Sequence, residues 1–443
     1  MATNPVVNML KIKELRSRLL FTFVILAVFR LGSVLTIPGI NASVLLKYFE
    51  DLAAQNKNAF ASYMDFFAGG AFSNFSVFML GVMPYISTQI IMQLALIIFP
   101  PLKRAAQEDG GQRKVASWTR IGTVIVCIFQ SLAVTVFAGS IPGAIVMDGI
   151  AFKFLTILTV TTGSMITVWL GNQITAHGIG NGISMLIFAG IVARMPHAIA
   201  ELVTRVKSHD INFVFVIVAL IMFVFIIALV VYEQSGERKI PVHYAKRVVG
   251  RKMYGVNDTY IPLKINPSGV IPVIFASAFL TFPLQIASSF ASSSNASRWI
   301  SKLSNLLNPT GIFYNVVLVL LIIFFAYFYT QVTLNPIEIA KNIRENGGSI
   351  PGIRTDKTES YLQKVLNRLV LPGSLYLAVI AVLPTIIQNL FNFPQSISTL
   401  MGGTSLLILV GVDLDTMSQV EALLKMHHHD GLVKKGKIRS RNL

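Results

Sequence analysis

The chain has few of the residues that soluble enzymes use for chemistry. Only 13% of its 443 residues are charged, 53% are hydrophobic, and cysteine occurs once. That residue, Cys127, lies within an apolar run, so a disulfide framework is excluded and a packing role is favoured. This composition is typical of a polytopic membrane protein and not of a soluble domain of this length.

Sequence patterns of common enzyme and cofactor sites are also missing. Residues 178–182 are rich in glycine but lack the spacing of a dinucleotide-binding loop, and a turn before a helix explains them better. Residues 431–437 resemble a phosphate-binding loop, yet Ile438 stands where Ser or Thr must hold magnesium. The three adjacent histidines at 427–429 have no further ligands and define no metal site. We therefore expect no catalytic residue, no metal and no cofactor.

Ionisable side chains are scarce within the apolar runs. Arg30 is the only clear case, and it lies near enough to the end of its run to reach the membrane surface. Ion-coupled transport requires buried ionisable residues, so this scarcity argues against a secondary transporter, the main alternative function. An intramembrane hydrolase would need a catalytic dyad within the spans, and the sequence offers none.

Ten long apolar runs are present, each long enough to cross a ~30 Å hydrocarbon layer as a helix. They cover residues 19–37, 72–99, 121–138, 152–170, 183–199, 212–232, 267–290, 312–333, 369–390 and 399–417. With a cytoplasmic N-terminus, 28 of the 37 Lys and Arg residues fall on the cytoplasmic side, as the positive-inside rule requires. The sequence therefore predicts an all-α multi-pass membrane protein with both termini in the cytoplasm.

The runs divide into two groups of five around residues 200–211. Because each half has an odd number of runs, the halves would cross the membrane in opposite senses, which permits an inverted repeat. The predicted organisation is a cytoplasmic segment at 1–18, an N-terminal half at 19–199, an external hinge at 200–211, a C-terminal half at 212–420 and a basic tail at 421–443.

Three segments between runs are unusual. Residues 59–70 are apolar but would cover only ~18 Å as a helix, so they form either a re-entrant piece packed on protein or a helix lying flat at the surface. The cytoplasmic connections 233–265 and 334–368 are far longer than the usual two to eight residues. Both mix charges with Gly, Pro and Tyr, and we expect them to be folded protrusions.

Aliphatic residues recur on single helix faces. Val82 and Ile86 are spaced i, i+4, as are Ile183 and Ile187. Ordinary helix packing explains such pairs, and so does a ring of side chains that seals a water pathway by dewetting. Periodicity alone leaves both interpretations open.

Several longer strings carry a family resemblance. They are FRLGSVLTIPGI (29–40), FFAGGAFSNFSVFMLGVMPYIS (66–87), GQRKVASWTR (111–120), GIGNGISMLIFAGIV (178–192), VHYAKRVVGRKMYG (242–255), NPIEIAKNIRENGGSIPGIR (335–354) and GGTSLLILV (402–410). Their order and spacing resemble the SecY family, the large subunits of bacterial protein-conducting channels. The resemblance extends from the first apolar run to the last.

The resemblance implies a fold and a set of site residues. Two inverted five-helix halves with a re-entrant plug helix would clamp an hourglass pore. Its waist ring would consist of Val82, Ile86, Ile183, Ile187, Ile274 and Ile408. The plug, within residues 59–70, would include Ser62, Tyr63, Met64, Asp65, Phe66 and Phe67. Ser87 and Phe282 would face each other across a lateral gate that releases apolar segments into lipid.

The resemblance also implies partners at the cytoplasmic (inner) membrane. These are the small membrane subunits SecE and SecG, the SecA ATPase, the ribosome through its RNA phosphates, a translocating polypeptide or signal sequence, and anionic lipid. Four basic residues of the first protrusion suit RNA phosphate: Arg238, Lys239, Arg251 and Lys252. Arg354 on the second protrusion is the residue expected to couple the motor, because a guanidinium pairs in bidentate fashion with carboxylate or phosphate.

The chain departs from the family pattern at three places. Asn172, Ala176 and His177 stand where two acids and an arginine are typical, which places a charge network in doubt. Val82 replaces the commoner isoleucine of the waist. Residues 237–239 read Glu-Arg-Lys where paired arginines are frequent, so ribosome affinity would be weaker.

Overall fold

A computed structural model describes most of the chain. The described residues are 12–41, 43–45, 47–48, 65, 68–139, 141–146, 149–208, 213–244, 247–249, 252–254, 259–291, 306–307, 311–391 and 403–435. They separate into two compact units. The first contains residues 1–200, 285–301 and 411–443, and the second contains 201–284 and 302–410.

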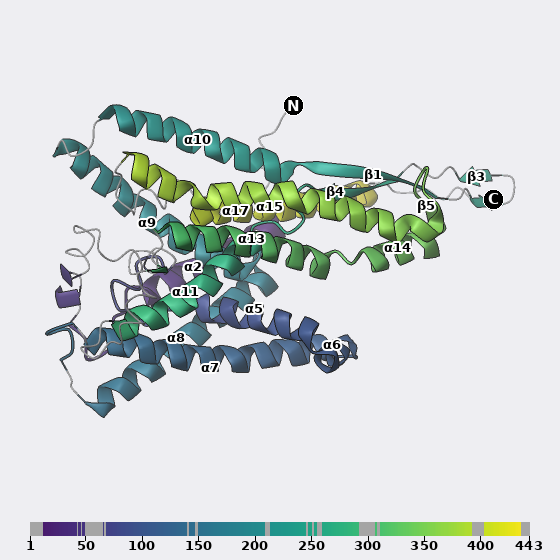
Figure 1. The fold of residues 1–443 in the computed structure, drawn as a ribbon. Coiled ribbons are helices and arrows are strands. Elements are labelled where there is room, and N and C mark those ends of the chain that lie inside the picture. Colours follow the sequence, from purple (N-terminus) through teal and green to yellow (C-terminus); the bar gives the residue numbers. More distant parts are fainter. Residues whose placement is uncertain are drawn as a thin grey trace. The chain divides into compact units, whose positions relative to one another are not determined.

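The first unit is built from long helices. They are α2 (Lys13–Gly32), α5 (Met83–Ile98), α6 (Pro100–Gln107), α7 (Gly111–Gly139), α8 (Ile150–His177) and α9 (Gly182–Lys207), whose last residues belong to the second unit. Helices α5, α7 and α8 pack in sequence, and α2 also contacts α8 (Figure 1). Their outward faces carry many exposed aliphatic and aromatic side chains, as expected for helices in lipid.

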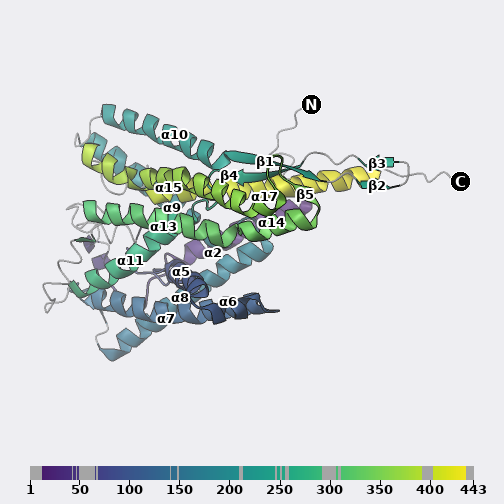
Figure 2. The same cartoon turned by 45° about the vertical axis from the view of Figure 1, so that its right-hand side comes forward.

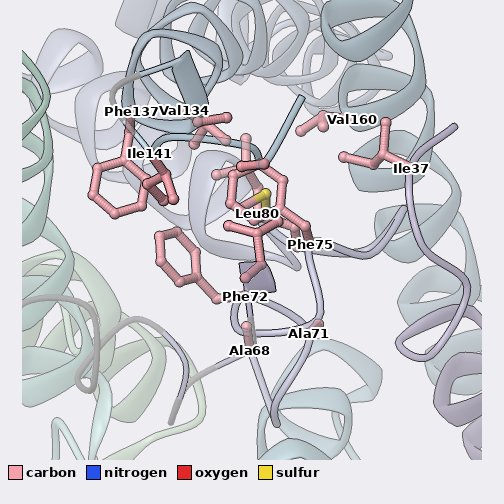
Figure 3. Close-up of a cluster of buried hydrophobic side chains, with 14 residues drawn as sticks. Ile37, Ala68, Ala71, Phe72, Phe75, Leu80, Val134, Phe137, Ile141 and Val160 are labelled. Atoms are coloured by element: carbon pink, nitrogen blue, oxygen red, sulfur yellow. The ribbon is translucent and has the colours of Figure 1, made fainter. Parts of the chain in front are cut away.

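The second apolar run is not one continuous helix, contrary to expectation. Its helix, α5, begins only at Met83, and residues 68–82 follow a series of turns. These turns are buried: Phe72, Phe75 and Leu80 pack with Phe137 of α7 and Val160 of α8 in one apolar cluster (Figure 3). Irregular backbone at membrane depth is tolerated only where protein covers it, and this cluster supplies the cover.

A sharp bend follows α5. Helices α5 and α6 meet at 103°, and Phe99 between them has extended backbone. Proline at the next two positions, Pro100 and Pro101, explains the bend, because proline disfavours helical geometry in the residue before it and is well suited to a helix start. The bend directs α6, which carries Lys103 and Arg104, away from the apolar run.

The second unit combines helices with a small sheet. Its elements are α10 (Phe213–Ser235), β1 (Glu237–Tyr244), β2 (Arg247–Val249), β3 (Lys252–Tyr254), β4 (Thr259–Lys264), α11 (Ile271–Ala291), α13 (Ile312–Thr333), α14 (Pro336–Glu345), β5 (Gly348–Ser349), the 3-10 turn η1 (Thr355–Lys357), α15 (Thr358–Phe391) and the start of α17 (Gly403–Lys435). Helices α13 and α15 pack along each other. From Gly411 onward, α17 belongs to the first unit.

Both long connections are folded, as the sequence predicts, but their described residues form one protrusion and not two. Strand β1 pairs antiparallel with β4, and its last residues pair with β5 of the second connection. Helix α14 and the start of α15 complete the core (Figure 2). That core includes Ile240, Val242, Ile343 and Leu362, each no more than 5% exposed.

Each expected apolar run contains a helix within the described residues. Six helices of this part of the chain are long and apolar enough to cross a membrane, or seven if α5 and α6 count as one bent span. The fold is therefore that of an all-α multi-pass membrane protein, whereas the full number of ten spans stays a prediction.

Candidate functional site

Two of the predicted waist residues lie where α5 begins. Val82 is the residue that precedes the helix, and Ile86 follows one turn later. The Ile86 amide donates to the Val82 carbonyl at 3.1 Å, which places both side chains on one face. Val82 and Ile86 are 6% and 3% exposed. The helix starts here because Pro84 favours its first turn and the buried turns of 68–82 end here.

Two further waist residues lie in the first turns of α9. Asn181 precedes this helix, and its side-chain oxygen accepts from the amides of Ile183 at 3.1 Å and Ser184 at 3.4 Å. Asparagine is among the preferred residues at this position because it satisfies free amides of the first turn. Ile187 is buried, and Ile183 is half-buried beside Gly171 of α8. This turn therefore sets where both isoleucines project.

The turn before α9 is held by hydrogen bonds from other elements. Thr22 of α2 accepts from the Ile179 amide at 3.2 Å, and Gln419 of α17 accepts from the Gly180 amide at 2.9 Å. Thr175 of α8 accepts from the Gly182 amide at 2.9 Å. Gly180 has φ +83°, which glycine adopts without strain. The glycine-rich string is thus a turn before a helix, as expected.

The other two waist residues belong to the second unit. Ile274 lies in the first turn of α11 and is half-buried, and Ile408 lies in α17 and is fully buried. All six aliphatic residues therefore lie near the beginning of a helix. Their assembly into one ring stays a prediction.

The predicted gate and plug residues are described only in part. Ser87 is buried in α5, and its hydroxyl donates to the Met83 carbonyl at 3.1 Å. The side chain of Phe282 lies outside the described residues, as do the plug residues Ser62, Tyr63, Met64, Phe66 and Phe67. The sixth plug residue, Asp65, is described and is only 3% exposed.

An ion pair inside the first unit was not predicted. Asp65 pairs with Arg194 of α9, although Arg30 was expected to be the only clear ionisable residue within a run. Arg30 in turn donates to the carbonyl of Gly69. The sequence held a clue: an Asp in one apolar segment and an Arg within the run 183–199 each need a partner, because an unpaired buried charge is costly.

Three of the predicted partner-binding residues, Arg238, Lys239 and Arg354, are exposed on the described part of the protrusion. Along β1, Arg238 and Lys239 are exposed, whereas Ile240 and Val242 point into the core. The Lys239 ammonium lies 4.7 Å from the centre of the Tyr260 ring on β4, a cation–π contact. Arg354 is exposed at the residue before η1. Lys252 is in β3, and Arg251 lies outside the described residues.

These geometries contain no arrangement typical of catalysis in the part of the chain that the structure describes. Within that part, no three His, Cys, Asp or Glu side chains gather as metal ligands would. What the described elements do provide is a set of buried aliphatic residues at helix starts, an apolar exterior and a basic protrusion. This combination suits passage or binding of a polymer better than a reaction on a small molecule.

Comparisons with known proteins decide the family. The family model for SecY matches residues 76–417. A protein of Borreliella burgdorferi named protein translocase subunit SecY is 44% identical over 420 residues, which cover 94% of this chain and 94% of the relative. The Escherichia coli K12 protein of the same name is 40% identical over 431 residues, with 96% and 95% covered. The chain belongs to the SecY family.

Solved structures have the SecY fold despite low sequence identity. A structure titled as that of a protein conducting channel matches with a TM-score of 0.63 at 18% identity, covering 95% of this chain and 97% of the other. Sec61 in a canine ribosome-channel complex from the endoplasmic reticulum matches with a TM-score of 0.60 at 17% identity, with the same coverage. At these identities the likeness concerns the fold alone.

One departure from the SecY pattern has a visible contact. The resemblance predicted that His177, at the end of α8, takes the place of an arginine, and in the structure its ring packs edge-on against Phe21 of α2 at 5.8 Å between centroids. An aromatic contact therefore occupies this position. The neighbouring Asn172 and Ala176 carry no charge, so these three residues hold no acidic member of a charge network.

Proposed function

We propose that this chain is the channel subunit of a protein translocase, which passes unfolded secretory polypeptides across a membrane and releases apolar segments sideways into lipid. The near full-length identity to proteins named protein translocase subunit SecY carries the proposal. The fold agrees with it, because solved protein-conducting channels share it over nearly the whole chain.

The proposed pore is closed at its waist by branched aliphatic side chains. Val82, Ile86, Ile183, Ile187, Ile274 and Ile408 would form the ring. A narrow ring of such side chains sheds water and so blocks ions without a charged barrier, yet it can yield around an extended peptide. The segment 59–70 would act as the plug on the external side. Ser87 and Phe282 would line the gate through which an apolar helix leaves by partition into lipid.

The proposed location is the cytoplasmic (inner) membrane, with both termini and the protrusion on the cytoplasmic side. The support is the excess of Lys and Arg on that side. The protrusion residues Arg238, Lys239, Arg251 and Lys252 would bind ribosomal RNA phosphates, and Arg354 would engage SecA. SecE and SecG would complete the complex, and the basic tail at 421–443 would attract anionic lipid. Energy would come from the partner, and no cofactor is assigned to this chain.

A stalled translocation intermediate tests the proposal. A photo-crosslinking amino acid is placed at Ile86 and, as a control, at Ile125, which is 51% exposed on α7. A secretory precursor fused to a folded domain is halted during export. Capture at position 86 and not at position 125 is expected, because the chain passes the waist and not the lipid-facing surface. Capture at 125 alone, or at neither position, would refute a path through the waist.

A further inference from the structure

Asp65, within the proposed plug segment 59–70, is attached to α9 by a buried ion pair. Asp65 has a side chain only 4% exposed, and it pairs with Arg194, whose side chain is 27% exposed. The second function of this carboxylate is local: its Oδ1 accepts from the Ser73 amide at 2.7 Å. The Asp65 carbonyl also accepts from the Gly70 amide at 2.9 Å. Asp65 is thus hydrogen-bonded to Gly70 and Ser73 and ion-paired to α9.

A second arginine attaches the same segment to α2. Arg30, in the last turn of α2, donates to the Gly69 carbonyl and also lies 3.4 Å from the Ser33 hydroxyl. Gly69 has φ +64°, and a Cβ atom there would lie 2.7 Å from the Gly190 Cα of α9. Only glycine permits this approach. Asp65 and Gly69 therefore contact two helices of one unit, with an arginine from each.

The energetics of such a pair favour positioning over stability. Removing two charges from water costs about as much as their attraction returns, so a buried ion pair adds little net stability. Loss of one partner is different, because it leaves the other charge buried and uncompensated. Arg194 retains some solvent exposure, whereas Asp65 does not. If Arg194 alone moves away, the buried Asp65 carboxylate loses its counter-charge, so separation of the pair is favourable only when Asp65 also moves.

We propose that Arg30, Asp65 and Arg194 form an arginine clasp, which holds the segment at the root of the plug against α2 and α9 while the channel is closed. Release of the clasp accompanies plug displacement when a polypeptide passes. The inference rests on the proposed function, since it assumes that residues 59–70 are the plug. It adds positioning residues that act through that plug and do not themselves line the waist.

Resting ion conductance tests the clasp, because it measures the ion leak through the closed channel. The full-length chain, with the subunits that co-purify, is placed in planar bilayers without any precursor. Arg194→Gln should raise the conductance at least about tenfold, the factor that corresponds to ~1.4 kcal/mol. Asp65→Asn should raise it less, because the buried charge itself is removed. Arg194→Lys keeps the charge and should stay near the parent. The double variant Asp65→Asn with Arg194→Gln should leak no more than Arg194→Gln alone, because both substitutions break the same interaction.

Two further variants complete the design. Glu201→Gln breaks the Glu201–Arg205 pair on the same helix and should leave the conductance unchanged. Gly69→Ala keeps every charge but forces the segment away from Gly190, and it should leak like Arg194→Gln. It therefore tests the clasp even if the charge variants do not reach the membrane.

The outcomes separate this inference from the proposed pore. Ile86→Gly, which removes one aliphatic side chain from the proposed waist ring, serves as the reference. If Ile86→Gly leaks while Arg194→Gln and Gly69→Ala match the parent, the clasp is refuted and the waist stands. If the clasp variants leak and Ile86→Gly does not, the clasp stands and the waist assignment fails. Equal leaks from Arg194→Lys and Arg194→Gln, or additive leaks in the double variant, also refute the ion pair.

Discussion

Gly163→Ala tests whether close packing on α8 positions the irregular backbone that leads into α5. Gly163 lies in the middle of α8, and a Cβ atom built there would be 2.8 Å from the carbonyl carbon and 2.9 Å from Cγ1 of Val77, with the Val77 carbonyl oxygen closer still. Val77 belongs to the turns that end at Val82. The added methyl group thus presses on the segment that carries a predicted waist residue.

The magnitude follows from that geometry. Ordinary contacts begin near 3.4 Å, so the carbonyl carbon alone requires a separation of ~0.6 Å, the difference between 3.4 and 2.8 Å, and the nearer carbonyl oxygen requires more. Overpacking of this kind costs ~1 to 3 kcal/mol, and a backbone carbonyl cannot rotate away as a side chain can. Alanine recovers at most ~1 kcal/mol of helix propensity. The net expectation is a destabilisation of up to ~2 kcal/mol, the upper overpacking cost less the recovered helix propensity, together with an increased resting leak.

Thermal unfolding in detergent and planar-bilayer conductance measure the two effects on the same preparation. Gly139→Ala on α7 is the matched control, since its Cβ would meet only the Ile145 Cδ1 atom at 3.9 Å. The control should be as stable as the parent, or slightly more so, and should not leak. If Gly163→Ala unfolds at or above the temperature of the parent, the close approach of α8 to Val77 is wrong.

Two further predictions concern the protrusion. Leu362→Ala removes a side chain that is 1% exposed in the core of the protrusion and should cost ~2 to 5 kcal/mol locally. Limited proteolysis should therefore cleave the protrusion faster. The control Leu371→Ala, at a site 50% exposed on the same helix, should not change the rate. Arg354→Glu should reduce SecA-driven export of a precursor into vesicles by at least about tenfold, equivalent to ~1.4 kcal/mol, with the channel inserted at its normal level. Lys357→Glu is the neighbouring control. Normal export by the Arg354→Glu variant would remove Arg354 from the coupling mechanism.

Hydrophobic runs predicted the helices well because burial in lipid, and not specific packing, decides their existence. The runs at 152–170 and 312–333, for example, lie within α8 and α13. The prediction was wrong where tertiary structure overrides composition. Residues 72–82 are as apolar as a helix, yet Phe75 adopts φ +46° and Gly81 φ +53°. Hydropathy cannot distinguish backbone that lipid surrounds from backbone that protein covers.

In the candidate site, contacts between residues close in sequence were predictable, and contacts between distant residues were not. Helix periodicity identified the pairs Val82/Ile86 and Ile183/Ile187, because neighbours on a helix are local in sequence. The partners Asp65 and Arg194 are 129 positions apart, and no local pattern links them. The folding of residues 233–265 and 334–368 was expected from their length and composition. The pairing of β1 with β5 across the two connections was not expected, because strand register depends on the packed core.

Polar and apolar residues have separate tasks in the first unit. The predicted waist residues are aliphatic, so their side chains make no directional bonds that would fix where they lie. Their positions depend instead on the backbone that leads into α5 and α9. The Asn181 side chain, with Thr22 and Gln419, holds the turn before α9, and Asp65 accepts from the Ser73 amide in the backbone that precedes α5. A seal made only of branched carbons can open without breaking hydrogen bonds. Substitutions in these polar residues should therefore change the leak, although none of them is a predicted waist residue.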